Sequence, residues 1–129
     1  MSATNTQYTP GQFVDDNEFL WRRIHSSWIK QYDDGQYVPS SAAFKGKDIS
    51  VDIASKTTPE KSIRDSAALA GFLAAVPKKL GHQVVEAPVP DNPAHALIMG
   101  KITRSEAHMI VNSSEWVIKP KHLSNKCSN

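Results

Sequence analysis

Two arginines and a histidine near the start of the chain form the first candidate site. Arg22 and Arg23 carry planar guanidinium groups that can bind carboxylates or phosphates, and His25 can transfer a proton near neutral pH. If this segment is a strand, the two arginines point to opposite faces, so only one can share a cleft with a given neighbour. The structural alternative is that both lie at the surface over Trp21 and Trp28.

The second candidate is a stretch of small hydroxyl residues, Ser40 and Ser41, between Pro39 and Phe44. Small residues let a ligand approach the backbone, and the hydroxyls can bind phosphate or ribose oxygens. With a base nearby they can also act as nucleophiles. The alternative is that one of the two serines caps a turn or a helix.

The third candidate follows three prolines within residues 88–93 and comprises Asp91, Asn92 and His95. A stiff loop that leads into a buried strand is a common place for a site, and His95 could serve as a general base. The alternative is an Asx turn followed by a strand-end histidine. Asp52, on the polar side of another strand, could orient a histidine of a neighbouring strand or face solvent.

Several established motifs are absent, namely CxxC pairs, HExxH, GxGxxG and the P-loop pattern. The single cysteine, Cys127, can form no internal disulfide and is too isolated to build a metal site. We therefore expect no metal and no cofactor. The sequence holds no secretory leader pattern and no apolar run long enough to span a membrane, which predicts a cytoplasmic protein.

Four segments have the pattern of strands. Residues 18–29 fit a short strand followed by a turn of helix, and Ile49, Val51 and Ile53 alternate with polar or small residues. Residues 83–87 indicate a short strand. Residues 95–101 form a nearly continuous apolar run, which is typical of a central strand covered on both faces.

Two helices are expected. Thr58 and Pro59 make a strong helix start, and the alanine-rich segment that follows predicts a helix up to about Val76. Thr103 and Glu106 have the spacing of a capping box, which predicts a second helix. Residues 116–118 either end that helix or form an edge strand. The sequence therefore predicts an α+β fold, with a single small sheet of three to four strands and two helices packed on one face.

The chain has 129 residues and is long enough for one domain with its own core. We expect a flexible N-terminal arm at 1–16, a single domain at 17–118 and a basic flexible tail at 119–129. The tail holds three of the lysines, and the other 118 residues carry 12 basic and 13 acidic side chains. This balance disfavours nucleic acid as the main partner.

Four segments in succession carry a resemblance to known proteins: 20–24, 39–44, 50–54 and 91–96. Their order resembles a small domain of bacterial proteins with no assigned activity, so it implies no reaction. The early arginine and the serine segment also resemble ADP-ribosyl-transferase-type folds. That likeness implies a nicotinamide nucleotide held by Arg22 or His25 and by Ser40 or Ser41, with Glu106 or Glu115 as the late acidic residue.

Two functions follow from these observations. The lack of a complete catalytic motif favours a protein-interaction or accessory binding module, whose partner is another protein. That hypothesis predicts an exposed apolar patch around Trp21, Trp28 or Trp116.

The alternative function is a small enzyme or ligand-binding domain that acts on a phosphate-bearing substrate, a nucleotide or an RNA end. In this hypothesis His25 and His95 act as acid and base. It predicts that the candidate residues meet in one pocket, because acid–base groups must nearly reach a shared reacting atom. The remaining residues assigned to this site are Arg22, Arg23, Ser40, Ser41, Asp52, Asp91 and Asn92.

Overall fold

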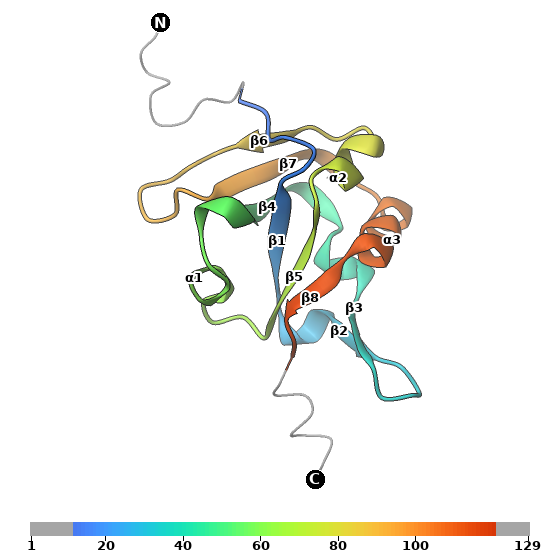
Figure 1. The fold of residues 1–129 in the computed structure, drawn as a ribbon. Helices are drawn as coiled ribbons and strands as arrows, with labels where there is room; N and C mark the ends of the chain where they lie inside the picture. The colour runs from blue at the N-terminus through green and yellow to red at the C-terminus, as the bar shows by residue number, and fades with distance from the viewer. Residues whose placement is uncertain (1–11, 121–129) are drawn as a thin grey trace, which may run out of the picture.

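A six-stranded antiparallel sheet dominates the computed structural model, which describes residues 12–120 (Figure 1). In chain order the elements are β1 (Phe19–Ile24), β2 (Ile29–Gln31), β3 (Tyr37–Pro39), β4 (Gly46–Ile53), α1 (Pro59–Ile63), β5 (Ala68–Leu73), α2 (Ala75–Lys79), β6 (Val84–Glu86), β7 (His95–Ile102), α3 (Arg104–Ser113) and β8 (Glu115–Ile118). The strand order of the large sheet is β6-β7-β4-β1-β5-β8, and β2 and β3 form a separate hairpin. Every pairing is antiparallel.

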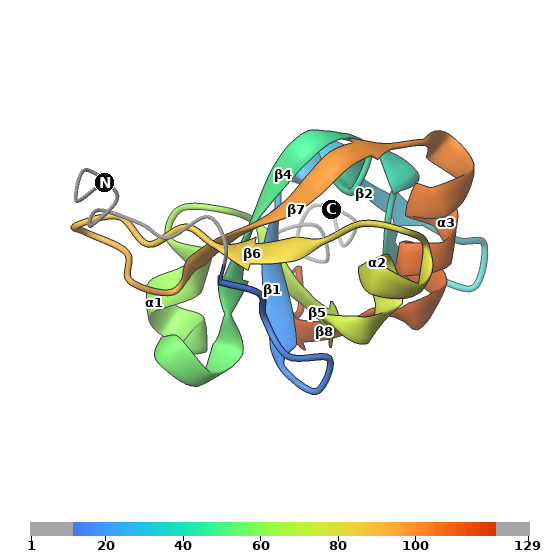
Figure 2. The ribbon, with the colours of Figure 1, turned by 90° about the horizontal axis from the view of Figure 1, so that it is seen from above.

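This architecture corrects the expected fold class. The α+β arrangement of three to four strands with two helices on one face is wrong, because the sheet has six strands and a second sheet is present. Three small α-helices and three 3-10 helices of three residues each accompany the strands within residues 12–120. α1 and α3 lie on opposite sides of β1 rather than together on one face (Figures 1 and 2).

The largest single error concerns the segment from 59 to 76. The predicted long helix is instead the five-residue α1, the strand β5 and the short α2. Arg64 ends α1 with a positive φ of 52°, a value that interrupts a right-handed helix. Five of the six residues of β5 are buried between β1 and β8, so pairing on both edges overrides the helix propensity of its alanines.

The other predicted elements are confirmed. The alternation at Ile49, Val51 and Ile53 lies in β4, and the apolar run from His95 lies in β7. The expectation that both faces of β7 are covered is wrong, because its buried residues alternate with partly exposed ones. The capping box is present, with Glu106 N donating to Thr103 Oγ1 and Thr103 N donating to Glu106 Oε1, at the start of α3. Residues 115–118 form β8 at one edge of the sheet.

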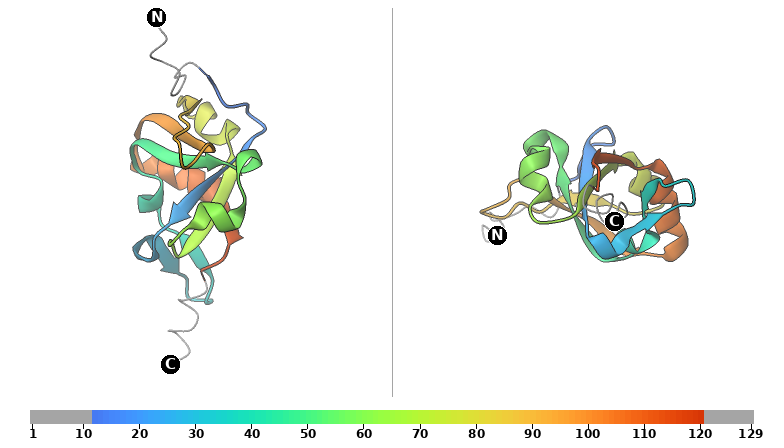
Figure 3. Two further views of the ribbon diagram at one scale, coloured as in Figure 1. Left: turned by 90° about the vertical axis from the view of Figure 1, so that its left-hand side faces the viewer. Right: turned by 90° about the horizontal axis from the view of Figure 1, so that it is seen from below.

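The hydrophobic core lies on one face of the sheet. Alternate residues of the central strands point into it, among them Leu20 and Ile24 of β1 and Val51 of β4. α3 closes this side with Ala107 and Ile110. The short helix α1 packs against β1 and β5, and Figure 3 (left) shows it in front of β1.

The chain enters the fold along the edge of β6. Val14 is 3% exposed and its N–H donates to the Val84 carbonyl, while Glu86 N donates to the Gln12 carbonyl. Residues 12–16 belong to the expected flexible arm, so the structure places the inner end of that arm against β6. Residues 1–11 of the arm, and 121–129 of the expected tail, lie outside the described residues.

Candidate functional site

The buried carboxylate of Asp52 is the centre of a polar cluster beside α1. Asp52 is 2% exposed, and its Oδ2 accepts hydrogen bonds from Ser62 Oγ at 2.7 Å and from Arg23 Nη1 at 3.3 Å. Its Oδ1 accepts from Asn92 Nδ2 at 2.9 Å. A buried charge is costly unless it is paired and hydrogen-bonded, and here both oxygens are satisfied.

Four separate elements meet at Asp52. Arg23 comes from β1, Asp52 from β4, Ser62 from α1 and Asn92 from the loop before β7. Arg23 Nη1 also donates to the Ser62 carbonyl at 3.0 Å, so the guanidinium joins β4 to α1 through one acceptor on each. The short helix is therefore held on the sheet by polar contacts, and Thr58 caps its start by accepting from Lys61 N.

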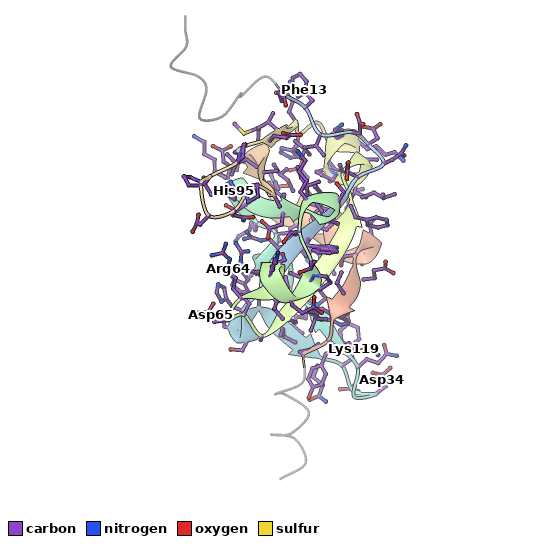
Figure 4. All side chains as sticks on the ribbon, turned by 60° about the vertical axis from the view of Figure 1, so that its left-hand side comes forward. Phe13, Asp34, Arg64, Asp65, His95 and Lys119 are labelled. Carbon is purple, nitrogen blue, oxygen red and sulfur yellow. The ribbon has the colours of Figure 1, made fainter. Side chains whose placement is uncertain are left out.

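His95 forms a second group next to this cluster. It pairs directly with Asp52 across β4 and β7, yet its ring bonds elsewhere. Nδ1 lies 2.8 Å from the Ala87 carbonyl oxygen, and Nε2 lies 3.1 Å from Ser50 Oγ. Ser50 and Asp52 are two residues apart on one strand, so both face the same side of the sheet as His95. Figure 4 shows His95 and Arg64 on the same side of the molecule.

The unengaged part of Arg23 faces this same surface. Its side chain is 29% exposed, and no residue among 12–120 accepts a hydrogen bond from its Nε or Nη2. These two nitrogens form one complete edge of the guanidinium, with parallel N–H groups suited to a phosphate or a carboxylate. The positive charge itself is balanced by Asp52, so binding at this edge depends on hydrogen-bond geometry more than on net charge.

Arg22 serves the opposite face of β1. Its Nε donates to the Ala43 carbonyl at 2.9 Å and its Nη1 donates to the Ser50 carbonyl at 2.8 Å. Burial lowers the pKa of Arg22 to about 10, with a smaller contribution from the charge of Arg23. The guanidinium carbon also lies 5.5 Å from the centre of the Trp28 ring. Arg22 therefore joins β1 to β4 and to the segment that follows Ser40.

The other two predicted groups lie with Arg22. Ser40 caps the short helix Ser41–Ala43, because its Oγ accepts from Ala42 N at 3.1 Å. His25 is exposed and its ring contacts that of Trp28 edge-on at 4.7 Å.

The structure thus brings together Arg23, Asp52, Asn92 and His95 but not His25. His25 stands only two residues after Arg23, but its ring contacts Trp28, the partner of Arg22, and no hydrogen bond among residues 12–120 joins it to the cluster. Asp91 is exposed in its loop and no hydrogen bond joins it to the cluster.

Three functional groups have no counterpart among the residues singled out in the sequence: Ser50, Ser62 and the Ala87 carbonyl. Ser50 could have been found, because it stands two residues before Asp52 in a predicted strand and so shares its face. Ser62 follows a recognisable cap, but nothing in the sequence places that helix against Asp52. The Ala87 carbonyl could not have been found, because every residue has a backbone carbonyl and the residue type does not show which one binds His95.

A separate groove lies between the β2-β3 hairpin and α3. It has a volume of about 320 Å³ and its lining includes Tyr32, Tyr37 and Trp116. Tyr32 is 52% exposed, whereas Trp116 is half-buried and its Nε1 donates to the Tyr37 carbonyl at 2.9 Å. The apolar patch expected around tryptophans is not seen in this form, because Trp21 and Trp28 are half-buried as well.

Comparison with protein-family models, with curated proteins and with solved structures found no match for this chain. Within residues 12–120, no group of three or more histidine, cysteine, aspartate or glutamate side chains could hold a metal ion. No helix in the same part of the chain is long and apolar enough to cross a membrane.

Proposed function

We propose that the face formed by Arg23, Ser50, Asp52 and His95 binds a phosphate-bearing small molecule. The observation that carries this proposal is the free Nε–Nη2 edge of Arg23, which is fixed in place by the bonds of Nη1 to Asp52 and Ser62. An immobilised guanidinium loses little side-chain entropy when it binds, and its two parallel donors match two phosphate oxygens.

A nucleotide is the member of this class that we favour. Trp21 precedes Arg23 by two residues on β1 and so faces the same side of the sheet. Its half-buried indole offers an aromatic surface on which a base can stack. The resemblance to ADP-ribosyl-transferase-type folds implies a nicotinamide nucleotide, so NAD⁺ is one of the ligands to test. The residues that this resemblance implies, such as Arg22 and His25, do not belong to the Arg23 face. A cytoplasmic location belongs to the same proposal.

Calorimetric titration of the full chain with AMP, ADP, NAD⁺, inorganic phosphate and a short RNA with a 5′-phosphate tests this function. Adenosine, which lacks the phosphate, is the matched ligand control. Arg23→Lys keeps a positive charge beside Asp52 but removes the free edge, and should weaken binding at least about tenfold, the effect of about 1.4 kcal/mol. Arg104→Lys, at an exposed position of α3, should bind like the wild type.

Two results would overturn the proposal. One is the absence of binding by every phosphate-bearing compound, and the other is equal affinity in the wild type and Arg23→Lys. Because Asp52 already balances the charge, we also expect a weaker salt dependence than an unpaired arginine would give.

A protein-interaction module is the second candidate, favoured by one specific observation. The groove lined by Tyr32, Tyr37 and Trp116 is aromatic, and aromatic-lined grooves bind extended peptides in several unrelated domains. Selection from a peptide library, repeated with Tyr32→Ala, tests it. Failure to enrich any sequence that depends on Tyr32 would remove this candidate.

A further inference from the structure

The hydrogen bonds of His95 fix which ring nitrogen carries the proton. The Ala87 carbonyl can only accept, so Nδ1 of a neutral His95 must donate to it over 2.8 Å. Nε2 then holds a lone pair, and the Ser50 hydroxyl donates to it over 3.1 Å. A hydroxyl within hydrogen-bond reach of a base that a third group orients is the arrangement of an activated nucleophile. We propose that Ser50 is a catalytic nucleophile and His95 its general base.

The orienting carbonyl is itself held firmly. Ala87 N donates to the His95 carbonyl at 2.9 Å, which closes the loop between them. Inside the loop, Ala94 N donates to Asn92 Oδ1, and Asn92 Nδ2 donates to the buried Asp52. Asp52 and Asn92 are therefore positioning residues, which act on His95 through the loop. The three prolines between 88 and 93 further restrict its motion.

Arg23 lies on the side that an anionic substrate would approach. The register pairs Trp21 with Asp52, and Arg23 and Ser50 each lie two residues from that pair toward the same end of the two strands. Both side chains thus face one side of the sheet. The inference rests on the proposed function, because Arg23 would hold the phosphate that Ser50 attacks.

The reaction class is transfer of a phosphoryl group from a phosphoester to water through a phosphoserine. Ser50 Oγ forms a bond to phosphorus, the Ser50 proton passes to His95 Nε2, and the bond from phosphorus to the ester oxygen breaks. That oxygen takes the proton from His95 and leaves as an alcohol. Water, deprotonated by His95, then attacks the phosphoserine, and the proton returns to Ser50 as phosphate leaves.

A fluorophosphonate probe tests the nucleophile directly, because Ser50 Oγ would displace its fluoride and keep the phosphonyl group. Mass spectrometry of the intact chain and of its peptides should show one adduct, located on Ser50. Ser50→Ala should show none, and His95→Gln should label at least about 100-fold more slowly, the smallest contribution expected of a general base. Ser105→Ala, at an exposed position of α3, is the matched control and should label like the wild type.

A cysteine variant tests the same contact in a second way, in case Ser50→Ala or His95→Gln fails to fold. Ser50→Cys should react with iodoacetamide faster than Ser105→Cys, and adding His95→Gln should remove the difference. No adduct on Ser50, or labelling that survives His95→Gln at the same rate, overturns the proposal. If Ser50 is not labelled but ligand binding depends on Arg23, only the nucleophile proposal is rejected. If Ser50 is labelled but no phosphate-bearing compound binds, the proposed function is rejected instead.

Discussion

Trp21 and Gly71 are partners across β1 and β5, and their contact leaves no room for a larger residue. A Cβ atom at position 71 would lie 3.0 Å from Trp21 Cδ1 and 3.0 Å from Val117 Cγ2. The backbone of Gly71 has no positive φ, so the cost of a substitution is steric alone. The absence of a side chain at Gly71 therefore leaves the space that the Trp21 indole occupies, on the same face of β1 as Arg23.

We predict that Gly71→Ala lowers the free energy of unfolding by about 1–3 kcal/mol, the usual cost of overpacking a filled site. Urea denaturation checks this value. In a Trp21→Ala background the same change should cost less, because one of the two close contacts is gone. An equal cost in both backgrounds would show that Trp21 does not set the limit.

His82 is the residue whose charge should couple stability to pH. Its two ring nitrogens face the Met99 carbonyl at 2.9 Å and Glu106 Oε1 at 3.0 Å, so the doubly protonated ring can donate to both. Burial opposes the charged form, but the hydrogen bonds to Glu106 and Met99 outweigh it and raise the pKa of His82 above 6.5. The Thr103 backbone bond, followed by the bond to His82, lowers the pKa of Glu106 below 4.5.

We predict that the free energy of unfolding of the wild type exceeds that of His82→Gln by the largest amount between pH 4.5 and 6.5. The raised pKa of His82 gives stability that is fully present below the unfolded value of 6.5 and is lost as pH rises through the folded value. The lowered pKa of Glu106 gives stability that is lost as pH falls below 4.5. Urea midpoints at pH 5.5 and 8.5 measure this. A larger gain at pH 8.5 would contradict the assignment.

At the scale of elements, α1 is the one whose attachment is most specific. Its five residues bury Ser62, which donates from its side chain to Asp52 and accepts from Arg23 at its carbonyl. A helix this short has little stability of its own. We infer that its place on the sheet depends on these contacts.

We predict that Ser62→Ala destabilises the fold by about 1.5–3 kcal/mol, because it removes a buried hydrogen bond to a charged group. Ser55→Ala is the matched control, since Ser55 donates to the carboxylate of Glu18 at an exposed site. It should change stability by less than about 0.5 kcal/mol. Urea unfolding compares the two variants, and equal losses would mean that Asp52 does not anchor α1.

The elements also show where sequence patterns suffice and where they do not. β4, β7 and α3 could be predicted because alternation, an unbroken apolar run and a capping box are local signals. β5 could not, because Ala68–Leu73 has the composition of a helix and becomes a strand through its neighbours β1 and β8. Five residues of β5 are buried because the strand pairs with β1 and β8, and no local sequence pattern indicates that pairing.

At the scale of the whole molecule, the candidate site depends on the order of the strands in the sheet, which no local sequence pattern indicates. Asp52, Asn92 and His95 were each identifiable as polar residues in or beside strands. Their meeting with Arg23 requires β1 and β7 to lie on either side of β4. His25 is separate for a local reason, because the chain leaves β1 after Ile24 and the His25 ring contacts Trp28.

The pairing of residues 12–14 with β6 also affects how much of this sheet edge is open to another chain. β6 is an edge strand, and an open edge offers backbone N–H and carbonyl groups to any passing strand. The bonds from Val14 and Glu86 occupy those groups within one chain. A chain shortened to begin at Asn17 would lose Val14 from the core and would expose this edge as a template for strand-to-strand association.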